Sequence, residues 1–168
     1  MRFNSALGLT LILSTLAVAT AHAQVAVGQV SAGPVALWNG GLRDIAWQAG
    51  GGGELLLNGP YSVGGDVDFM YFPEAETTFG NSGHASAPAT HAIAVSGRGA
   101  YYFDNHGSRR VRPFATGGLL YLADAEPMAL LQVSGGADWW TSRRTGLRIE
   151  VRAALGGMLA FRAGLVFR

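Results

Sequence analysis

Apolar and polar residues alternate strictly in several segments of the chain. In residues 147–152 (LRIEVR) three apolar side chains alternate with Arg148, Glu150 and Arg152. In residues 63–72 (VGGDVDFMYF) Asp66 and Asp68 share one face, opposite valine and aromatic residues. Successive side chains of a β-strand point to opposite faces, whereas a helix would not separate these charges. The pattern therefore predicts β-strands with one apolar and one charged face.

The same alternation predicts eight strands. The clearest lie near residues 63–72, 91–103, 147–152 and 158–168, and weaker ones near 25–37, 45–57, 110–123 and 128–140. The first contains Pro34, which cannot donate to a strand ladder, so it is the weakest prediction. No segment shows a helical period, and the 25 glycines would be costly in helices. The fold class is therefore all-β.

The connections place the long loop and the short turns at opposite ends of the sheet. Short polar turns at residues 58–60, 104–109 and 141–145 follow the second, fourth and sixth strands, and the long connection 73–90 follows the third. Strands of about 10 residues suit a tilted membrane crossing, and an even number is usual in bacterial barrels. We therefore predict an eight-stranded antiparallel up-and-down transmembrane β-barrel, with loop 73–90 on the outer side.

Composition narrows the function classes. Charged residues are only 14% of the chain, against a usual value of about 25%, and hydrophobic residues are 49%. There is no cysteine, which excludes disulfides and thiolate metal sites. Every basic residue is arginine, and beyond Arg2 the 11 arginines balance 11 acids, so no basic patch for nucleic acid is expected.

The N-terminus has the pattern of a secretory signal peptide. Arg2 precedes an apolar run from Ala6 to Val18, and Ala21-His22-Ala23 forms a small-residue cleavage site. The apolar run is shorter than the roughly 20 residues of a spanning helix. We expect residues 1–23 to be the signal peptide and residues 24–168 to be one barrel domain.

The charged faces are predicted to line the barrel interior. They carry five acids and five arginines: Glu54, Asp66, Asp68, Asp138 and Glu150 with Arg98, Arg112, Arg148, Arg152 and Arg162. An eight-stranded barrel is only wide enough for side chains to fill, so buried charges must pair. The alternative is that acids and arginines balance by chance on a solvated face.

Aromatic residues near the predicted strand ends indicate two interfacial girdles: Tyr61, Tyr101, Tyr102, Phe103, Phe114, Trp139, Trp140 and Phe167 at the turns, and Tyr71, Phe72 and Tyr121 at the other end.

Three segments resemble the last four strands of a known family: VRPFATGGLLYL, GGADWWTSRRTGLRIEVR and FRAGLVFR. The chain is similar to the small outer-membrane β-barrel proteins typified by the OmpA transmembrane domain and OmpX. The resemblance implies a cell outer-membrane location, contact with outer-membrane lipid, and recognition of the last strand by the barrel insertion machinery. Phe161, Leu165 and Phe167 match that insertion signal, and Arg168 after the final Phe departs from it.

Candidates for chemistry are few. His84, His91 and His106 have no partner at metal-ligand spacing, so no metal site or cofactor is expected. Ser82 or Ser86, His84 and Glu74 or Glu76 share the long loop, and such loops contain these residues routinely. Outer-membrane lipid A enzymes use a Ser and His pair, but His91 and Ser96 fall on opposite faces. We therefore expect that the protein is not an enzyme.

The pairs Arg109-Arg110 and Arg143-Arg144 lie at predicted turns, where they meet anionic head groups or are simply solvated.

These features together predict a structural or surface-interaction protein of the outer membrane. Its interior is expected to be filled by side chains, leaving at most a narrow conductance, and loop 73–90 is the expected contact surface for an unidentified partner. Two alternatives remain at this point. One is a lipid A-modifying barrel enzyme, and the other is a secreted, soluble lipocalin-like barrel that binds an apolar ligand.

Overall fold

The computed structural model describes residues 25–39, 42–79, 83–103, 110–123 and 127–168. The expected signal peptide, residues 1–23, lies outside the described residues. In the part that the structure describes, no helix is long and apolar enough to span a membrane.

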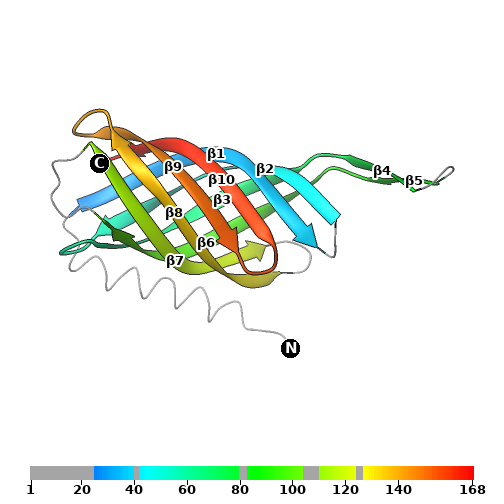
Figure 1. The fold of residues 1–168 in the computed structure, drawn as a ribbon, viewed down its shortest axis with the longest axis horizontal. Coiled ribbons are helices and arrows are strands. Elements are labelled where there is room, and N and C mark those ends of the chain that lie inside the picture. Colours follow the sequence, from blue (N-terminus) through cyan, green and yellow to red (C-terminus); the bar gives the residue numbers. More distant parts are fainter. Residues whose placement is uncertain (1–24, 40–41, 80–82, 104–109, 124–126) are drawn as a thin grey trace.

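Eight antiparallel strands form a closed barrel in the order β1-β10-β9-β8-β7-β6-β3-β2 (Figure 1). They are β1 (Val25–Asn39), β2 (Leu42–Leu56), β3 (Tyr61–Phe72), β6 (Thr90–Tyr102), β7 (Val111–Ala123), β8 (Met128–Trp140), β9 (Thr145–Ala154) and β10 (Met158–Phe167). The first and last strands pair with each other, from Gly28 opposite Phe167 to Leu37 opposite Met158. The predicted eight-stranded barrel is therefore confirmed.

Two further strands lie within the long connection. β4 (Ala75–Phe79) and β5 (Gly83–Ala87) pair antiparallel as a separate hairpin that projects beyond the barrel (Figure 1). The sequence pattern predicted only a loop here. The segments AETTF and GHASA are five residues long and lack the apolar alternation that marks a strand packed on a core, so the pattern gave no signal for them.

The barrel has two distinct ends. At the turn end, residues 57–60 join β2 to β3 and residues 141–144 join β8 to β9. The second of these turns is held by Ser142, whose hydroxyl oxygen accepts hydrogen bonds from the backbone N–H groups of Arg144 (3.1 Å) and Thr145 (3.0 Å). The predicted turn 104–109 lies outside the described residues. The opposite end, which carries the β4–β5 hairpin, is called the loop end.

The weakest predicted strand forms despite its proline. β1 pairs with β2 along its whole length, and Pro34 lies opposite Trp47. On its other side, Ala32 pairs with Ala163 of β10 and Val35 pairs with Ala160, so Gly33 and Pro34 are left out of the pairing. Because proline has no N–H to donate, this local gap is the expected consequence.

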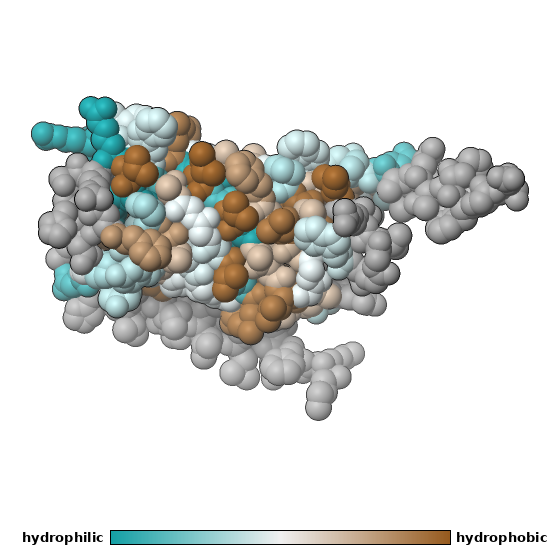
Figure 2. Space-filling view, viewed as in Figure 1, coloured by the Kyte–Doolittle hydropathy of each residue, from teal (hydrophilic) through white to brown (hydrophobic). Residues whose placement is uncertain are grey.

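The apolar face of the strands points outward. Mid-strand residues Val67, Leu131, Val133 and Ile149 are each at least half exposed, whereas the charged residues between them are buried. Figure 2 shows hydrophobic residues distributed over the barrel wall, with hydrophilic ones at its ends. This is the reverse of a soluble barrel, which hides its apolar face, so the soluble lipocalin-like alternative was wrong. The wall is suited to lipid contact, and the barrel is a transmembrane one.

Candidate functional site: the ion-pair network inside the barrel

The interior charges come from strands whose alternate positions face inward. β9 contributes Arg148, Glu150 and Arg152, and β3 contributes Asp66 and Asp68. The structure places nine of the ten predicted interior charges in buried positions, each no more than 4% exposed: Glu54, Asp66, Asp68, Arg98, Asp138, Arg148, Glu150, Arg152 and Arg162. The buried set therefore contains five carboxylates and four arginines.

Glu54 on β2 is the centre of the network near the turn end. Its carboxylate accepts hydrogen bonds from Arg98 Nη2 (3.0 Å), Ser62 Oγ (3.0 Å) and the Tyr102 hydroxyl (2.7 Å), and it also accepts one from Arg148. Arg148 in turn donates to both carboxylate oxygens of Asp138, at 2.6 and 2.9 Å. The bonds from Arg98, Tyr102 and Arg148 to Glu54 join strands that are not neighbours in the sheet, whereas Arg148 and Asp138 lie on the neighbouring strands β9 and β8.

A second group of charges lies toward the loop end. Arg152 donates to Asp66 at 2.8 Å, and Arg162 donates to Asp68 at 2.9 Å. Arg152 also lies 3.3 Å from Glu150 and 3.4 Å from Asp68. Each of these arginines therefore meets at least one carboxylate, as buried guanidinium groups require.

Arg98 and Gln29 join the two groups into one network. Arg98 Nη1 donates to Glu150 at 3.0 Å, while its Nη2 donates to Glu54. Gln29 uses both ends of its amide, since its nitrogen donates to Asp66 and its oxygen accepts from Arg148. Removing one member therefore disturbs partners on several strands at once.

Interior glycines make room for the long charged side chains. Gly64 on β3 lies in register between Glu54 on β2 and Arg98 on β6, and those two residues form their ion pair next to it. A Cβ at Gly64 would lie 2.2 Å from the Gly53 carbonyl oxygen and 2.9 Å from Glu54 Cγ. Gly50 and Gly52 similarly lie opposite Asp68 and Asp66. These positions require glycine for space.

Apolar layers enclose the network at both ends. Toward the loop end lies a buried cluster of small and aliphatic side chains: Val35, Ala46, Met70, Ala94, Leu120, Ala154, Met158 and Ala160. Toward the turn end, Val27, Trp140 and Val166 form one cluster and Ala100, Tyr102 and Phe114 another. Within the described part of the chain, the charged layer is therefore shielded from water along the barrel axis.

Arg112 departs from the expected network. Its side chain faces inward but is only half-buried, and its guanidinium carbon lies 4.4 Å from the centre of the Tyr102 ring. Among the described residues it forms no ion pair within 4.0 Å. Asp138 lies opposite Arg112 in the register of β7 and β8, but both of its carboxylate oxygens accept hydrogen bonds from Arg148.

The predicted aromatic girdles exist only in part. Tyr61, Tyr101, Phe103, Trp139 and Phe167 point outward at the turn end, but Tyr102, Phe114 and Trp140 are buried in the barrel. Period-two alternation demands this, because neighbours such as Tyr101 and Tyr102 must face opposite sides. At the loop end, half-buried Phe72 faces inward, and the outward aromatics include Trp38 and Trp47, which the sequence analysis did not assign.

The residues of the predicted insertion signal share the outward face of the last strand. Phe161, Leu165 and Phe167 are 47%, 53% and 45% exposed. The guanidinium of Arg168 instead turns back, with its central carbon 4.1 Å from the centre of the Trp140 ring.

The structure does not bring the candidate catalytic residues together. His91 is exposed and stacks on Phe69 with ring centres 5.8 Å apart, while Ser96 is buried and donates to Asp66 at 2.8 Å. The side chains of the long-loop candidates, residues 76–86, lie outside the described residues, as does His106. In the described ranges no group of three His, Asp or Glu residues could hold a metal ion.

The uncharged members of the network were not predicted from the sequence. Gln29, Ser62, Ser96 and Tyr102 all donate to buried carboxylates. The alternation along each strand could have identified them, because each lies on the inward face of its strand. Arranged in this way, the charged and uncharged polar residues of the interior stabilise the barrel together.

Comparisons with known proteins agree with this architecture. No protein-family model matches the sequence. A search of curated proteins also found no match. Among solved structures, the N-terminal β-barrel domain of OprF from Pseudomonas aeruginosa aligns with a TM-score of 0.59 and 14% identity, covering 86% of this chain and 98% of that domain. Neisserial surface protein A (NspA) aligns with a TM-score of 0.61 and 12% identity, covering 84% of this chain and 96% of that protein. The chain has the fold of small outer-membrane β-barrels.

Proposed function

We propose that this protein is an outer-membrane barrel with a structural or surface-interaction role, which holds the β4–β5 hairpin at the cell surface. The projection of this hairpin beyond the barrel is the observation that carries the proposal (Figure 1). A lipid-facing wall around a buried ion-pair network gives the hairpin a fixed base. The folds of OprF and NspA, both outer-membrane barrels of similar length, support this location.

The interior supports a closed barrel rather than an open pore. Charges at its centre are paired, and apolar clusters lie on both sides of them. An ion entering would have to pass an apolar layer before reaching the paired charges, and both steps are costly. We therefore expect at most a narrow conductance, far below that of a porin. Recordings in planar lipid bilayers test this, and stable porin-sized steps would contradict it.

The outward face of β10 fits recognition by the barrel insertion machinery. Phe161, Leu165 and Phe167 form one exposed apolar row on the last strand, where they are available before the barrel closes against β1. We expect Phe167→Ser to lower the amount of folded protein in the outer membrane of cells. The matched outward change Leu159→Ser, near the opposite end of β10, should have a smaller effect.

Membrane topology is the main test of the proposal. The chain has no cysteine, so single-cysteine variants give an unambiguous label. Ser86→Cys places the label in the hairpin and Ser142→Cys places it in the β8–β9 turn. With a membrane-impermeant maleimide, Ser86→Cys should react on intact cells, and Ser142→Cys should react only after the outer membrane is permeabilised. Labelling of Ser142→Cys alone on intact cells would reverse the topology and reject the surface role.

A further inference from the structure

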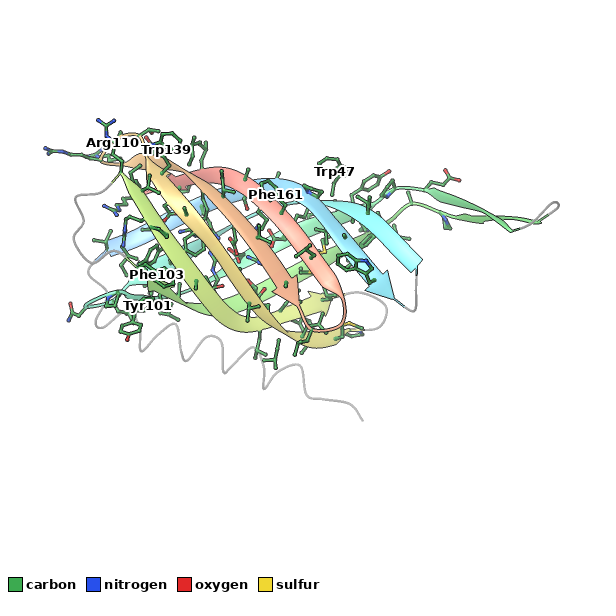
Figure 3. The ribbon with its side chains drawn as sticks, viewed as in Figure 1. Trp47, Tyr101, Phe103, Arg110, Trp139 and Phe161 are labelled. Atoms are coloured by element: carbon green, nitrogen blue, oxygen red, sulfur yellow. The ribbon has the colours of Figure 1, made fainter. Side chains whose placement is uncertain are left out.

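Exposed arginines gather at one side of the turn end. Arg110 precedes β7, Arg143 and Arg144 lie in the β8–β9 turn, and Arg168 follows β10. We call these four residues the arginine patch. Figure 3 shows Arg110 beside Trp139 at this end of the barrel. Because β7, β8, β9 and β10 are consecutive in the sheet, the four residues occupy one continuous arc of the rim.

Backbone hydrogen bonds hold the arc together. The Trp140 N–H donates to the Arg110 carbonyl oxygen at 2.7 Å, and the Arg168 N–H donates to the Arg144 carbonyl oxygen at 2.9 Å. These contacts place Arg110 beside the end of β8, and Arg144 beside the end of β10. The patch is therefore built on the ordered edge of the sheet rather than on a long loop.

The arc carries positive charge without exposed acids among the described residues. The carboxylates nearest to this end, Glu54 and Asp138, are buried and bonded within the interior network. The other described side of the rim, at the start of β1 and in the turn 57–60, carries no charged residue. Among the rim residues that the structure describes, the positive charge thus lies on one side of the barrel.

The depth of the patch matches that of lipid head groups. Val111 pairs with the outward-facing Trp139, and Arg110 is the next residue beyond that pair. Thr145 pairs with the outward-facing Phe167, and Arg144 and Arg168 are the next residues beyond it. One strand residue spans about 3.4 Å, and interfacial aromatics mark the boundary of the hydrocarbon layer. Arg110 and Arg144 therefore lie where phosphates begin, and Arg168 lies at the same depth with its guanidinium over the Trp140 ring.

From this arrangement we infer that the arginine patch binds the phosphate groups of anionic phospholipids in the membrane leaflet at the turn end. Arginine presents a planar fork of donors that fits a phosphate oxygen pair, and a basic residue near an anionic membrane surface attracts it electrostatically. The one-sided arc gives the barrel a preferred annular lipid on the β7–β10 side. The inference assumes the membrane location proposed above.

Spin-labelled lipids measure this preference directly. The full-length mature barrel is inserted into phosphatidylcholine vesicles, and electron spin resonance gives the protein-restricted fractions of labelled phosphatidylglycerol and labelled phosphatidylcholine. The wild-type protein should retain phosphatidylglycerol several-fold over phosphatidylcholine at low salt, and the ratio should fall as salt screens the charges. Arg110→Gln, Arg143→Gln and Arg144→Gln combined should bring the ratio close to one.

A matched pair of single variants isolates position from net charge. Arg144→Gln removes one arginine from the patch, and Arg43→Gln removes one from β2 at the loop end. Only Arg144→Gln should lower the phosphatidylglycerol ratio. An unchanged ratio in the triple variant, or equal losses in the two single variants, would overturn the inference. Heat modifiability on gels, measured on the same vesicles, shows separately whether the barrel has inserted. If the barrel inserts but shows no lipid preference, only the lipid binding by the arginine patch is refuted, and the proposed membrane location stands.

Discussion

The unequal number of buried charges makes the two partners of one ion pair respond differently to mutation. The buried set has five carboxylates and four arginines, so it carries one excess negative charge. Glu54→Gln removes that excess, whereas Arg148→Met doubles it. The two residues form one hydrogen-bonded pair, so a simple count of lost contacts would predict similar costs.

The contacts of each residue set the expected magnitudes. Without Arg148, Asp138 meets no other arginine among the described residues, and Glu54 keeps only Arg98. Leaving a buried carboxylate unpaired costs roughly 3–5 kcal/mol. With Glu54→Gln, Arg98 keeps Glu150 and Arg148 keeps Asp138. The amide oxygen in the place of Oε1 still accepts from both arginines, and the NH2 group in the place of Oε2 donates to the Tyr102 hydroxyl. That change converts charged hydrogen bonds into neutral ones and should cost about 1–2 kcal/mol.

Urea unfolding in lipid vesicles measures both costs. All four tryptophans lie in the barrel strands, so their fluorescence reports the transition, and heat modifiability verifies the starting fold. The free energy of unfolding should fall about 2 kcal/mol further for Arg148→Met than for Glu54→Gln. Equal losses, or a larger loss for Glu54→Gln, would refute the argument that excess negative charge governs the interior. Wild-type stability in Arg148→Met would refute the buried pairing itself.

Two further predictions concern space and polarity in the wall. Gly118→Ala should destabilise by about 1–3 kcal/mol in urea unfolding, since its Cβ would lie 2.1 Å from the Gly97 carbonyl oxygen, whereas Gly117→Ala on the same strand has no atom within 4 Å and should be neutral. Equal effects would contradict the space argument. Val133→Arg, in the middle of the lipid-facing side of β8, should cost roughly 2–4 kcal/mol, and Asn58→Arg in the exposed turn between β2 and β3 should cost almost nothing. A tolerated Val133→Arg in vesicles would place this face away from hydrocarbon.

Alternation was enough to predict the strands and the faces of their residues. LRIEVR could only be a two-faced strand, and its charges do face inward. The partner of each charged side chain does not follow from its face, because it depends on which other side chains reach the same carboxylate inside the barrel. Arg112 and Arg98 both face inward, but Arg98 bonds to Glu150 and Glu54, whereas the carboxylate opposite Arg112, Asp138, is bonded to Arg148 instead. Sequence therefore identified candidates for the network without assigning their partners.

Pairing across the barrel was also inaccessible to the sequence. Arg98 and Glu150 are 52 residues apart, and Arg148 and Glu54 are 94 apart. Their strands are not neighbours in the sheet, so even a correct list of adjacent strands would not join them. The β4–β5 hairpin escaped prediction for a different reason: its two five-residue segments, AETTF and GHASA, have no apolar face in their sequence.

The abundance of glycine and the use of arginine have a common cause. The run Gly50 to Gly53 alternates between faces, and its inward members lie opposite Asp68 and Asp66. Long guanidinium groups that meet these carboxylates need a wall without side chains beside them, and glycine provides it. Arginine can satisfy several carboxylates with its fork of donors, which a lysine point charge does less well. A narrow barrel with a charged interior therefore requires both residue types together, and the Gly-rich runs belong to the same network as the charges.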